Sequence, residues 1–208
     1  MLTYLIHSIV SLFAVMNPFG ILPTFLALTN TYSPPEQRQI ARKAILNSFV
    51  ILLVFLLLGN VILNLFSITI NAFRVAGGIL LFGIAYDLLH AKLSPIQSPY
   101  NKESRPTQDI TMTPLALPII AGPGTITTVM ALAADPQAVS ASIAVFVAFV
   151  LVLIATYIIF YYAAAINKRL GQERLNVITR LMGFVLSIIA IQMAATGLAG
   201  LFPAWVHG

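Results

Sequence analysis

The segment Asn17-Pro18-Phe19-Gly20 decides the fold, because it interrupts a stretch from Met1 to Pro35 that contains no charged residue. Proline lacks a backbone donor and clashes with the carbonyl group four residues earlier, and glycine permits non-helical dihedral angles. A second segment of this kind, Ala121-Gly122-Pro123-Gly124-Thr125, lies inside another uncharged stretch, Ile110 to Ala134. We therefore expect two apolar helices that are each broken near their middle.

The composition of the whole chain is that of a membrane protein. Of 208 residues, 59% are hydrophobic and 8% are charged, against about 45–50% and about 25% in an ordinary soluble domain. The mean hydropathy is +0.95, and a chain this short cannot bury so much apolar surface in a core of its own. A soluble globular protein is thereby excluded. The absence of cysteine excludes disulfides, thiol redox relays and thiolate metal sites.

Charged residues mark the limits of the membrane spans, because each costs roughly 2.5–3.5 kcal/mol at the centre of a membrane helix. Five uncharged stretches can each hold a helix of about 20 residues, and a sixth span, from about Ala72 to Leu89, contains Asp87. The expected helices lie near residues 4–28, 44–64, 72–90, 111–133, 139–164 and 178–202. The predicted fold class is an all-α membrane protein with six transmembrane helices, of which the first and fourth are discontinuous.

The basic residues lie almost entirely on one side of this topology. Ten of the eleven fall in the first, third and fifth connections, and Arg74 alone falls on the other side, which also receives both termini. The ten are Arg38, Arg42, Lys43, Lys92, Lys102, Arg105, Lys168, Arg169, Arg174 and Arg180. The positive-inside rule then predicts that both termini lie outside and that the three odd connections are cytoplasmic. Nucleic acid is not expected as a partner, because no basic patch exists apart from these short loops.

The two halves of the chain repeat weakly. A shift of 104 residues aligns Gly20–Leu28 with Gly124–Leu132, with four of nine positions identical, and a shift of 106 aligns Arg74 and Gly77 with Arg180 and Gly183. We expect a first three-helix repeat at 1–90, a cytoplasmic linker at 91–110 and a second repeat at 111–208. A unit with an odd number of spans enters the membrane from the opposite side the second time, so the repeats are inverted, an architecture typical of transporters.

The two broken helices are the candidate binding site. A break frees backbone N–H groups at one half-helix end, which favour a carboxylate, and C=O groups at the other, which favour an ammonium group or a cation. No charged side chain lies near either break, so a small ligand without net charge fits better than lysine or glutamate. The alternatives are that proline and glycine only kink the helices for packing and that the threonines only bond their own helix carbonyls. The candidate substrate-binding residues are Asn17, Pro18, Gly20, Thr24, Ala121, Gly122, Gly124, Thr125 and Thr128.

Three charged residues are candidates for coupling and gating. Asp87 is the only carboxylate inside a span, and a proton taken up there would couple transport to the proton gradient. The simpler interpretation is a residue near a helix end that reaches toward water, His90 or Lys92. Arg74 and Arg180, which correspond in the repeat, are candidate gating residues, although anchoring of the outer helix end is the simplest explanation of Arg74.

Three segments together resemble the hallmark segments of the MarC family: Asn17–Gly20, Phe73–Phe82 and Ala121–Ile126. The resemblance extends over nearly the whole chain. It implies a six-span bacterial inner-membrane protein of the LysE-like transporter superfamily with discontinuous first and fourth helices. Members of the family that are similar to SnatA carry small neutral amino acids such as glycine and alanine.

The expected function is therefore a secondary transporter, an exporter or an exchanger, of small neutral amino acids held at the broken helices. An enzyme is not expected, because His7, His90 and His207 sit near span ends and no nucleophile, Walker loop or metal cluster accompanies them. No cofactor is expected. The expected partners are the substrate, the lipid bilayer and a coupling proton or sodium ion, and a homo-oligomer is compatible with the sequence. The alternatives are a carrier of another small polar or lipid-linked metabolite and a membrane subunit that does not transport.

Overall fold

Every element that the computed structural model describes is helical. The described residues are 2–29, 31–90, 120–134 and 138–205. Their helices are α1 (Leu2–Met16), α2 (Pro18–Thr29), α3 (Pro34–Leu65), α4 (Ile70–Leu89), α5 (Pro123–Ala133), α6 (Ala138–Tyr161) and α7 (Ala163–Leu201), followed by the short 3-10 helix η2 (Pro203–Trp205). Five segments are long and apolar enough to cross a membrane, and α5 is a shorter apolar helix. An all-α membrane protein is thus confirmed.

The predicted break of the first span is confirmed. α1 ends at Met16, α2 begins at Pro18, and Asn17 between them has a φ of 46°. α5 begins at Pro123, at the place predicted for the break of the fourth span. The earlier part of that span and the predicted linker, residues 91–110, lie outside the described residues, so the discontinuity of the fourth span and the division into two repeats stay predictions.

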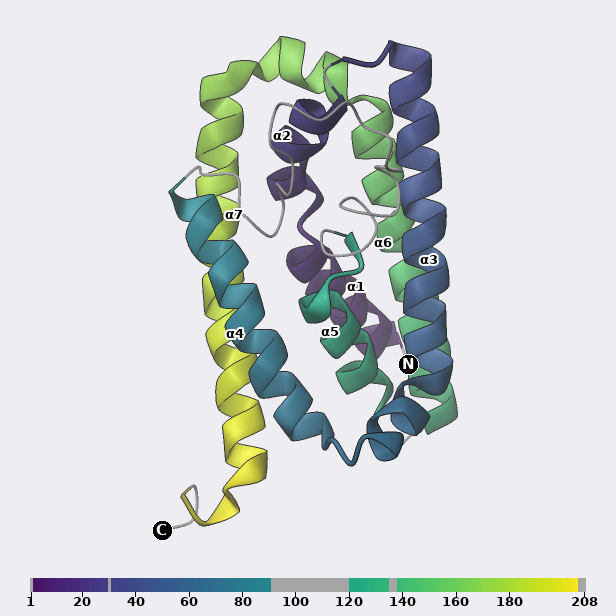
Figure 1. Cartoon of the computed structure of the whole chain (residues 1–208), viewed down its shortest axis with the longest axis vertical. Coiled ribbons are helices and arrows are strands. Elements are labelled where there is room, and N and C mark those ends of the chain that lie inside the picture. The colour runs from purple at the N-terminus through teal and green to yellow at the C-terminus, as the bar shows by residue number, and fades with distance from the viewer. Residues whose placement is uncertain (1, 30, 91–119, 135–137, 206–208) are drawn as a thin grey trace.

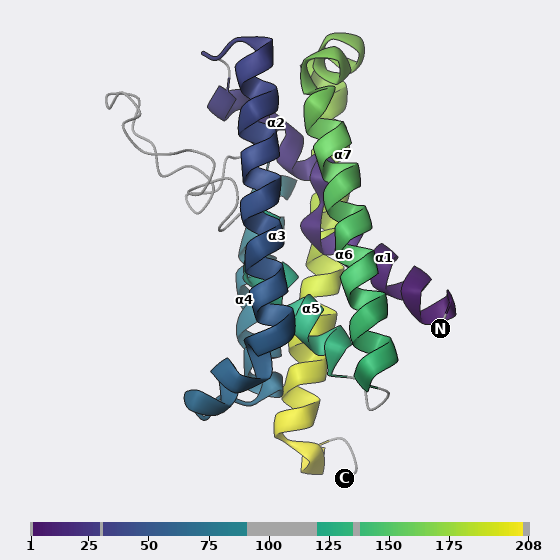
Figure 2. The same ribbon diagram turned by 90° about the vertical axis from the view of Figure 1, so that its right-hand side faces the viewer.

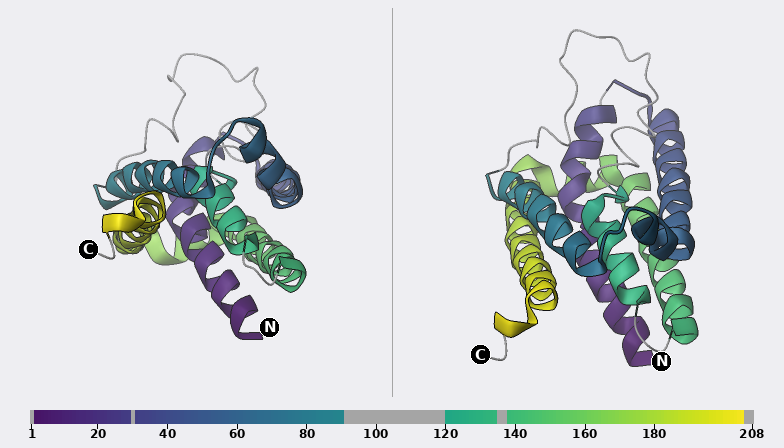
Figure 3. Two further views of the ribbon diagram at one scale, coloured as in Figure 1. Left: turned by 90° about the horizontal axis from the view of Figure 1, so that it is seen from below. Right: turned by 60° about the horizontal axis from the view of Figure 1, so that its bottom comes forward.

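The helices form an elongated bundle in which α3 lies antiparallel to α6 and α4 lies antiparallel to α7 (Figure 1). α3 and α7 run downward in this view, and α4 and α6 run upward. The predicted counterparts α3 and α6 are therefore opposed in direction, as are α4 and α7, which an inverted repeat requires. α1 and α2 cross the bundle obliquely, and their junction lies between the upright helices (Figure 2). Seen from below, the start of α1 projects away from the other helices (Figure 3).

α4 and α7 make the most extensive helix contact in the bundle, and glycines bring them together. A Cβ atom on Gly78 would lie 2.7 Å from the carbonyl oxygen of Ala190, and one on Gly197 would lie 2.7 Å from that of Asn71. Small residues permit this approach of two membrane helices. A large cluster of buried apolar residues lies among α1, α2, α3, α5 and α6. Within it, Phe25 stacks on Phe160 with ring centroids 4.4 Å apart.

Two helices extend farther than the sequence analysis predicted. α3 begins at Pro34 rather than near residue 44, and α7 begins at Ala163 rather than near residue 178. The carboxylate of Glu36 accepts hydrogen bonds from the backbone N–H and the hydroxyl of Ser33, at 2.7 and 2.6 Å, and so caps the start of α3. The predicted boundaries were wrong because charged residues mark where a helix leaves the bilayer, not where it ends. Gly171 forms a kink within α7, with φ 73° and ψ 162°.

Candidate functional site

Asn17 connects two helices by a single residue. Its backbone N–H donates to the carbonyl of Phe13 at 2.9 Å, which ends α1, and its side-chain Oδ1 accepts from the N–H of Gly20 at 3.2 Å, which caps α2. Asparagine is among the residues that adopt the left-handed conformation at low cost. Pro18 follows at the first helical position, where its missing N–H costs nothing. The break is therefore a junction at which both helix ends are capped.

Gly20 is required by this junction. A Cβ atom there would lie 2.3 Å from Nδ2 and 2.9 Å from Oδ1 of Asn17. Real Cβ atoms do not approach other atoms so closely, so any side chain at Gly20 would displace the Asn17 amide that caps α2. The two residues therefore act as one unit.

The start of α5 has the same construction. Gly122 is the N-cap residue, Pro123 occupies the first helical position, and the N–H of Ile126 donates to the carbonyl of Gly122 at 2.9 Å. Both half-helices thus begin with proline after a capping residue. The early N–H groups of such a helix have no partner within the helix, and they carry the positive end of its dipole.

A small cavity of about 20 Å³ lies between the α1–α2 junction and the start of α5. That space corresponds to roughly one water molecule. Its described lining comes from the end of α1, the junction and α2, from the start of α5, and from the facing sides of α4 and α7. The lining residues are Val15, Met16, Asn17, Ile21, Leu81, Ile84, Leu88, Gly122, Gly124, Thr125 and Leu186.

The Asn17 amide is the unusual polar group of this cavity. Asn17 is 2% exposed, and its Nδ2 has no hydrogen-bond partner in the part of the chain that the structure describes. Because Oδ1 accepts from Gly20, the group without a partner is the NH₂ donor. Leaving a buried donor unpaired costs about 1–3 kcal/mol, so such a group calls for an explanation. A bound ligand with an acceptor oxygen would give Nδ2 of Asn17 a hydrogen-bond partner.

The threonines of α5 bond mainly to their own backbone. The hydroxyls of Thr127 and Thr128 donate to the carbonyls four residues earlier, at 2.7 and 2.8 Å. The hydroxyl of Thr125 donates to the carbonyl of Ile120 at 3.0 Å, which ties the start of α5 to the residues before it. The back-bonding alternative therefore holds for Thr128. Thr125 lines the cavity, and its oxygen keeps lone pairs that can accept a hydrogen bond.

The structure brings four of the nine predicted substrate residues together. Asn17, Gly122, Gly124 and Thr125 line the cavity. Pro18, Gly20, Thr24, Ala121 and Thr128 do not, although Gly20 positions Asn17 and the first four of these five are buried.

Sequence reasoning missed the apolar side of the cavity. Leu81, Ile84 and Leu88 of α4 and Leu186 of α7 close it. A Cβ atom on Gly124 would lie 2.7 Å from Cδ1 of Leu81, so this leucine rests directly on the start of α5. Positions 81, 84 and 88 share one helix face, but every face of α4 is apolar, and hydrophobic periodicity therefore could not single them out.

The charged candidates lie away from the cavity. Asp87 is half-buried, two residues before the last residue of α4, and adjoins the lining residue Leu88 in sequence. Nδ1 of His90 lies 2.8 Å from the carbonyl oxygen of Tyr86, so His90 is engaged with its own helix. Arg74 is the fifth residue of α4 and donates to Oδ1 of Asn71 at 3.4 Å, whereas Arg180 is exposed on α7. Arg74 and Arg180 do not line the cavity.

Comparison with known proteins gives matches over nearly the whole chain. Residues 2–202 match the model of the MarC family integral membrane proteins. The chain is similar to UPF0056 membrane protein YvbG of Bacillus subtilis, with 49% identity over 98% of each chain. It is 40% identical to UPF0056 membrane protein MJ0972 of Methanocaldococcus jannaschii, over 97% of this chain and 89% of that one, and 35% identical to UPF0056 membrane protein YhcE of Escherichia coli, over 95% and 93%. No solved structure matches.

Proposed function

The chain belongs to the MarC family of integral membrane proteins, and we propose that it is a secondary transporter of small neutral amino acids, such as glycine and alanine, that binds its substrate at the helix breaks. The observation that carries the proposal is the buried Asn17 amide, whose Nδ2 has no partner in the described residues and which lines the cavity beside the start of α5. Family membership supports the membrane location, and the substrate is inferred from the chemistry of the cavity.

The substrate carboxylate would accept hydrogen bonds from Nδ2 of Asn17 and from the N–H groups at the start of α5. Gly124 and Thr125 hold the second and third positions of that helix, where N–H groups have no partner within the helix. The positive end of the helix dipole favours a negative charge at the same place. A carboxylate can therefore bind without a basic side chain, and no Arg or Lys lines the cavity in the described part of the chain.

The substrate ammonium group would bind at the other side of the junction. Pro18 has no N–H, so the carbonyl of Ala14 receives no hydrogen bond from the position four residues later. The end of α1 carries the negative end of its helix dipole, and the Thr125 oxygen supplies a further acceptor. The two ends of a zwitterion would thus meet complementary ends of two half-helices.

The apolar lining limits the substrate side chain. Leu81, Ile84, Leu88 and Leu186 offer no partner to a charged side chain, so lysine and glutamate would lose their hydration without compensation. A cavity of about 20 Å³ is smaller than glycine. Binding therefore requires that the pair α4 and α7 move relative to α2 and α5, as rocking of one unit against the other around a midplane site would produce.

Coupling and orientation complete the proposal. The first turns of α3 and α7 carry Arg38, Arg42 and Lys168 and lie at the upper end in Figure 1, and the start of α4 with Arg74 lies at the lower end. The positive-inside rule makes the upper end cytoplasmic, which puts both termini outside. A proton on Asp87 or a sodium ion on the carbonyls of the break would couple transport to an ion gradient. A bacterial inner membrane stays an expectation, because relatives occur in archaea as well.

The test is ligand-dependent stabilisation of the purified protein in detergent, because a ligand that binds only the folded state raises the apparent melting temperature. Glycine and alanine are expected to stabilise the protein, and lysine and glutamate are not. Asn17→Asp keeps an oxygen to cap α2 but removes the NH₂ donor, so it is expected to abolish the ligand-dependent shift. Because the new carboxyl group is buried without a basic partner, it is also expected to lower the melting temperature without ligand, and each shift is measured against the variant's own ligand-free value. The matched control is Asn64→Asp, at an exposed position on α3.

Two outcomes would contradict the proposal. The first is an amino-acid shift that survives in Asn17→Asp, which would place the site elsewhere. The second is stabilisation by a lipid-linked intermediate and by no amino acid, which would favour a carrier of lipid-linked metabolites.

A further inference from the structure

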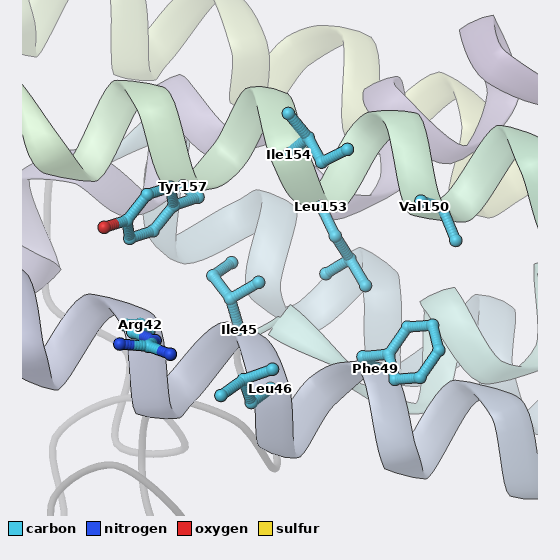
Figure 4. Close-up of a pocket in the computed structure, with 8 residues that line it drawn as sticks. All are labelled: Arg42, Ile45, Leu46, Phe49, Val150, Leu153, Ile154 and Tyr157. Atoms are coloured by element: carbon cyan, nitrogen blue, oxygen red, sulfur yellow. The ribbon is translucent and has the colours of Figure 1, made fainter.

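A second and larger cavity lies on the outside of the bundle, between α3 and α6. It has a volume of about 260 Å³ and is lined by Arg42, Ile45, Leu46, Phe49, Val150, Leu153, Ile154 and Tyr157 (Figure 4). None of these residues lines the cavity at the helix breaks. The proposed transport function does not use this groove.

The groove is apolar along most of its length and open to the surroundings of the bundle. Six of its eight lining residues are aliphatic or phenylalanine, and Leu46 and Ile154 on its rim are 52% and 50% exposed. From Arg42 to Phe49 the groove follows α3 for seven residues, which is about 10 Å. That length is roughly two-thirds of one leaflet of the hydrocarbon core, whose full thickness is about 30 Å.

One end of the groove is polar. The Arg42 guanidinium and the Tyr157 hydroxyl lie at the same end, and Phe49 and Val150 lie at the other (Figure 4). One turn farther along both helices, the guanidinium of Arg38 lies 4.2 Å from the ring centroid of Tyr161. The antiparallel helices α3 and α6 thus bring together two arginine and tyrosine pairs, spaced four residues apart on each helix.

The charge at this end is positive and uncompensated in the described residues. Arg38, Arg42 and Lys43 fall within two turns of α3, and no carboxylate lines the groove. Glu36, the nearest acidic residue on the helix, accepts hydrogen bonds from Ser33 and points to the cap of α3. Arg42 lies two residues before the uncharged stretch that starts at Ala44, so we place the guanidinium where the helix passes from water into lipid.

We propose that this groove binds an anionic phospholipid. The phosphate accepts charge-assisted hydrogen bonds from Arg42, whose planar guanidinium suits a phosphate group, and a further hydrogen bond from the Tyr157 hydroxyl. One acyl chain lies along the apolar part between α3 and α6. Basic pockets between membrane helices at the headgroup level are suited to such lipids. A second copy of the chain fits the groove less well, because its helix would bury the Arg42 charge without an acidic partner.

The test measures lipid binding to the purified full chain in a neutral detergent by native mass spectrometry. The probes are phosphatidylglycerol and phosphatidylcholine with identical acyl chains, and soluble glycerol phosphate as a competitor. Phosphatidylglycerol is expected to bind more tightly than phosphatidylcholine. Arg42→Gln is expected to weaken phosphatidylglycerol binding about fivefold, the effect of one basic residue at an anionic membrane surface, and to leave phosphatidylcholine binding unchanged.

Two matched controls make the result specific. Lys43→Gln removes the same charge from the neighbouring residue, which does not line the groove, and is expected to change the affinity little. Ile154→Trp fills the groove from its exposed rim and is expected to weaken the binding of both lipids, whereas Ile143→Trp, at a residue 51% exposed elsewhere on α6, is not.

Four results would overturn the proposal. Equal affinity for the two lipids, or an equal loss in Arg42→Gln and Lys43→Gln, would mean that Arg42 does not recognise a phosphate in the groove. Displacement of the lipid by glycerol phosphate at equal concentration would indicate a site for a soluble anion. Conversion of a dimer to a monomer by Ile154→Trp, but not by Ile143→Trp, would show that a second copy occupies the groove.

Discussion

Asn17 performs three tasks with one side chain and one backbone unit. It ends α1, caps α2 and lines the cavity with an amide whose Nδ2 has no partner in the described residues. Sequence reasoning could locate the break, because proline and glycine change the backbone wherever they occur. It could not predict which atom of the Asn17 amide has no hydrogen-bond partner. That depends on the hydrogen bond from the Gly20 N–H to Oδ1, which forms only in the folded chain.

Gly20→Ala is predicted to destabilise the protein. In an ordinary helix this exchange stabilises by roughly 0.5–1 kcal/mol, but here the new Cβ would displace the Asn17 amide, and loss of a cap costs about 0.5–2 kcal/mol. The measurement is the apparent melting temperature in detergent. The control is Gly83→Ala, where a Cβ meets no atom within 4 Å. Equal melting temperatures for the two variants would contradict the prediction.

Gly124→Ala is predicted to weaken alanine binding about tenfold, which is ~1.4 kcal/mol, a cost within the range of overpacking. Its Cβ would press on Leu81, which closes the cavity. Adding Leu81→Ala should restore alanine binding and admit larger neutral amino acids. Titration calorimetry of the single and double variants measures the effect. Additive losses in the double variant would show that the two residues do not share one cavity.

At the scale of helices, apolar length and charge predicted the positions of some spans better than those of others, and the predicted number of six stays a prediction because five described segments are long enough to span a membrane. The third and fifth helices, expected at 72–90 and 139–164, appear at Ile70–Leu89 and Ala138–Tyr161. The start of α3 was predicted ten residues too late, because the prediction allowed only for the part of the helix inside the membrane. The 32 residues of α3 extend about 48 Å, well beyond a hydrocarbon core of about 30 Å. Its basic first turns stand in water, where the Ser33 and Glu36 cap keeps them helical.

Gly78→Ala is predicted to destabilise the contact between α4 and α7. The added Cβ would meet backbone atoms of Ala190 and Ala194 at 2.7 and 2.8 Å, and backbone cannot move aside as a flexible side chain can, so a cost of about 1–3 kcal/mol is expected. The measurement is again the melting temperature in detergent. Gly83→Ala lies on the same helix and serves as the control, and a Gly78→Ala protein of equal stability would rule out the tight contact.

At the scale of the molecule, the two inverted repeats stay a prediction, because residues 91–119 lie outside the described part of the chain. α3 and α6, and likewise α4 and α7, run in opposite directions as inverted counterparts must. The four-residue identity between Gly20–Leu28 and Gly124–Leu132 was a weak signal, because apolar sequences match by chance. The two half-helices nevertheless begin alike, with proline after a capping residue.

Both termini are predicted to lie outside the cell. Single introduced cysteines can test this orientation, because the chain has no cysteine of its own. Thr31 is exposed and follows the upper end of α2 in Figure 1. Ser67 is exposed and follows the lower end of α3. A membrane-impermeant maleimide added to intact cells should label Ser67→Cys and leave Thr31→Cys unlabelled. Both variants should react once the cells are permeabilised. The reverse pattern would place the termini in the cytoplasm.

In the proposed site the charged groups of the substrate bind to backbone groups at the ends of α1 and α5, and this has an evolutionary consequence. Backbone dipoles do not change when side chains mutate, so the attraction for a carboxylate persists through most substitutions that keep the breaks. The leucines of α4 and α7 are free to vary independently. Under the proposed function, relatives of this protein can therefore acquire new cargo through substitutions at Leu81, Ile84, Leu88 and Leu186, while the helix ends that would bind the ammonium and carboxylate groups stay the same.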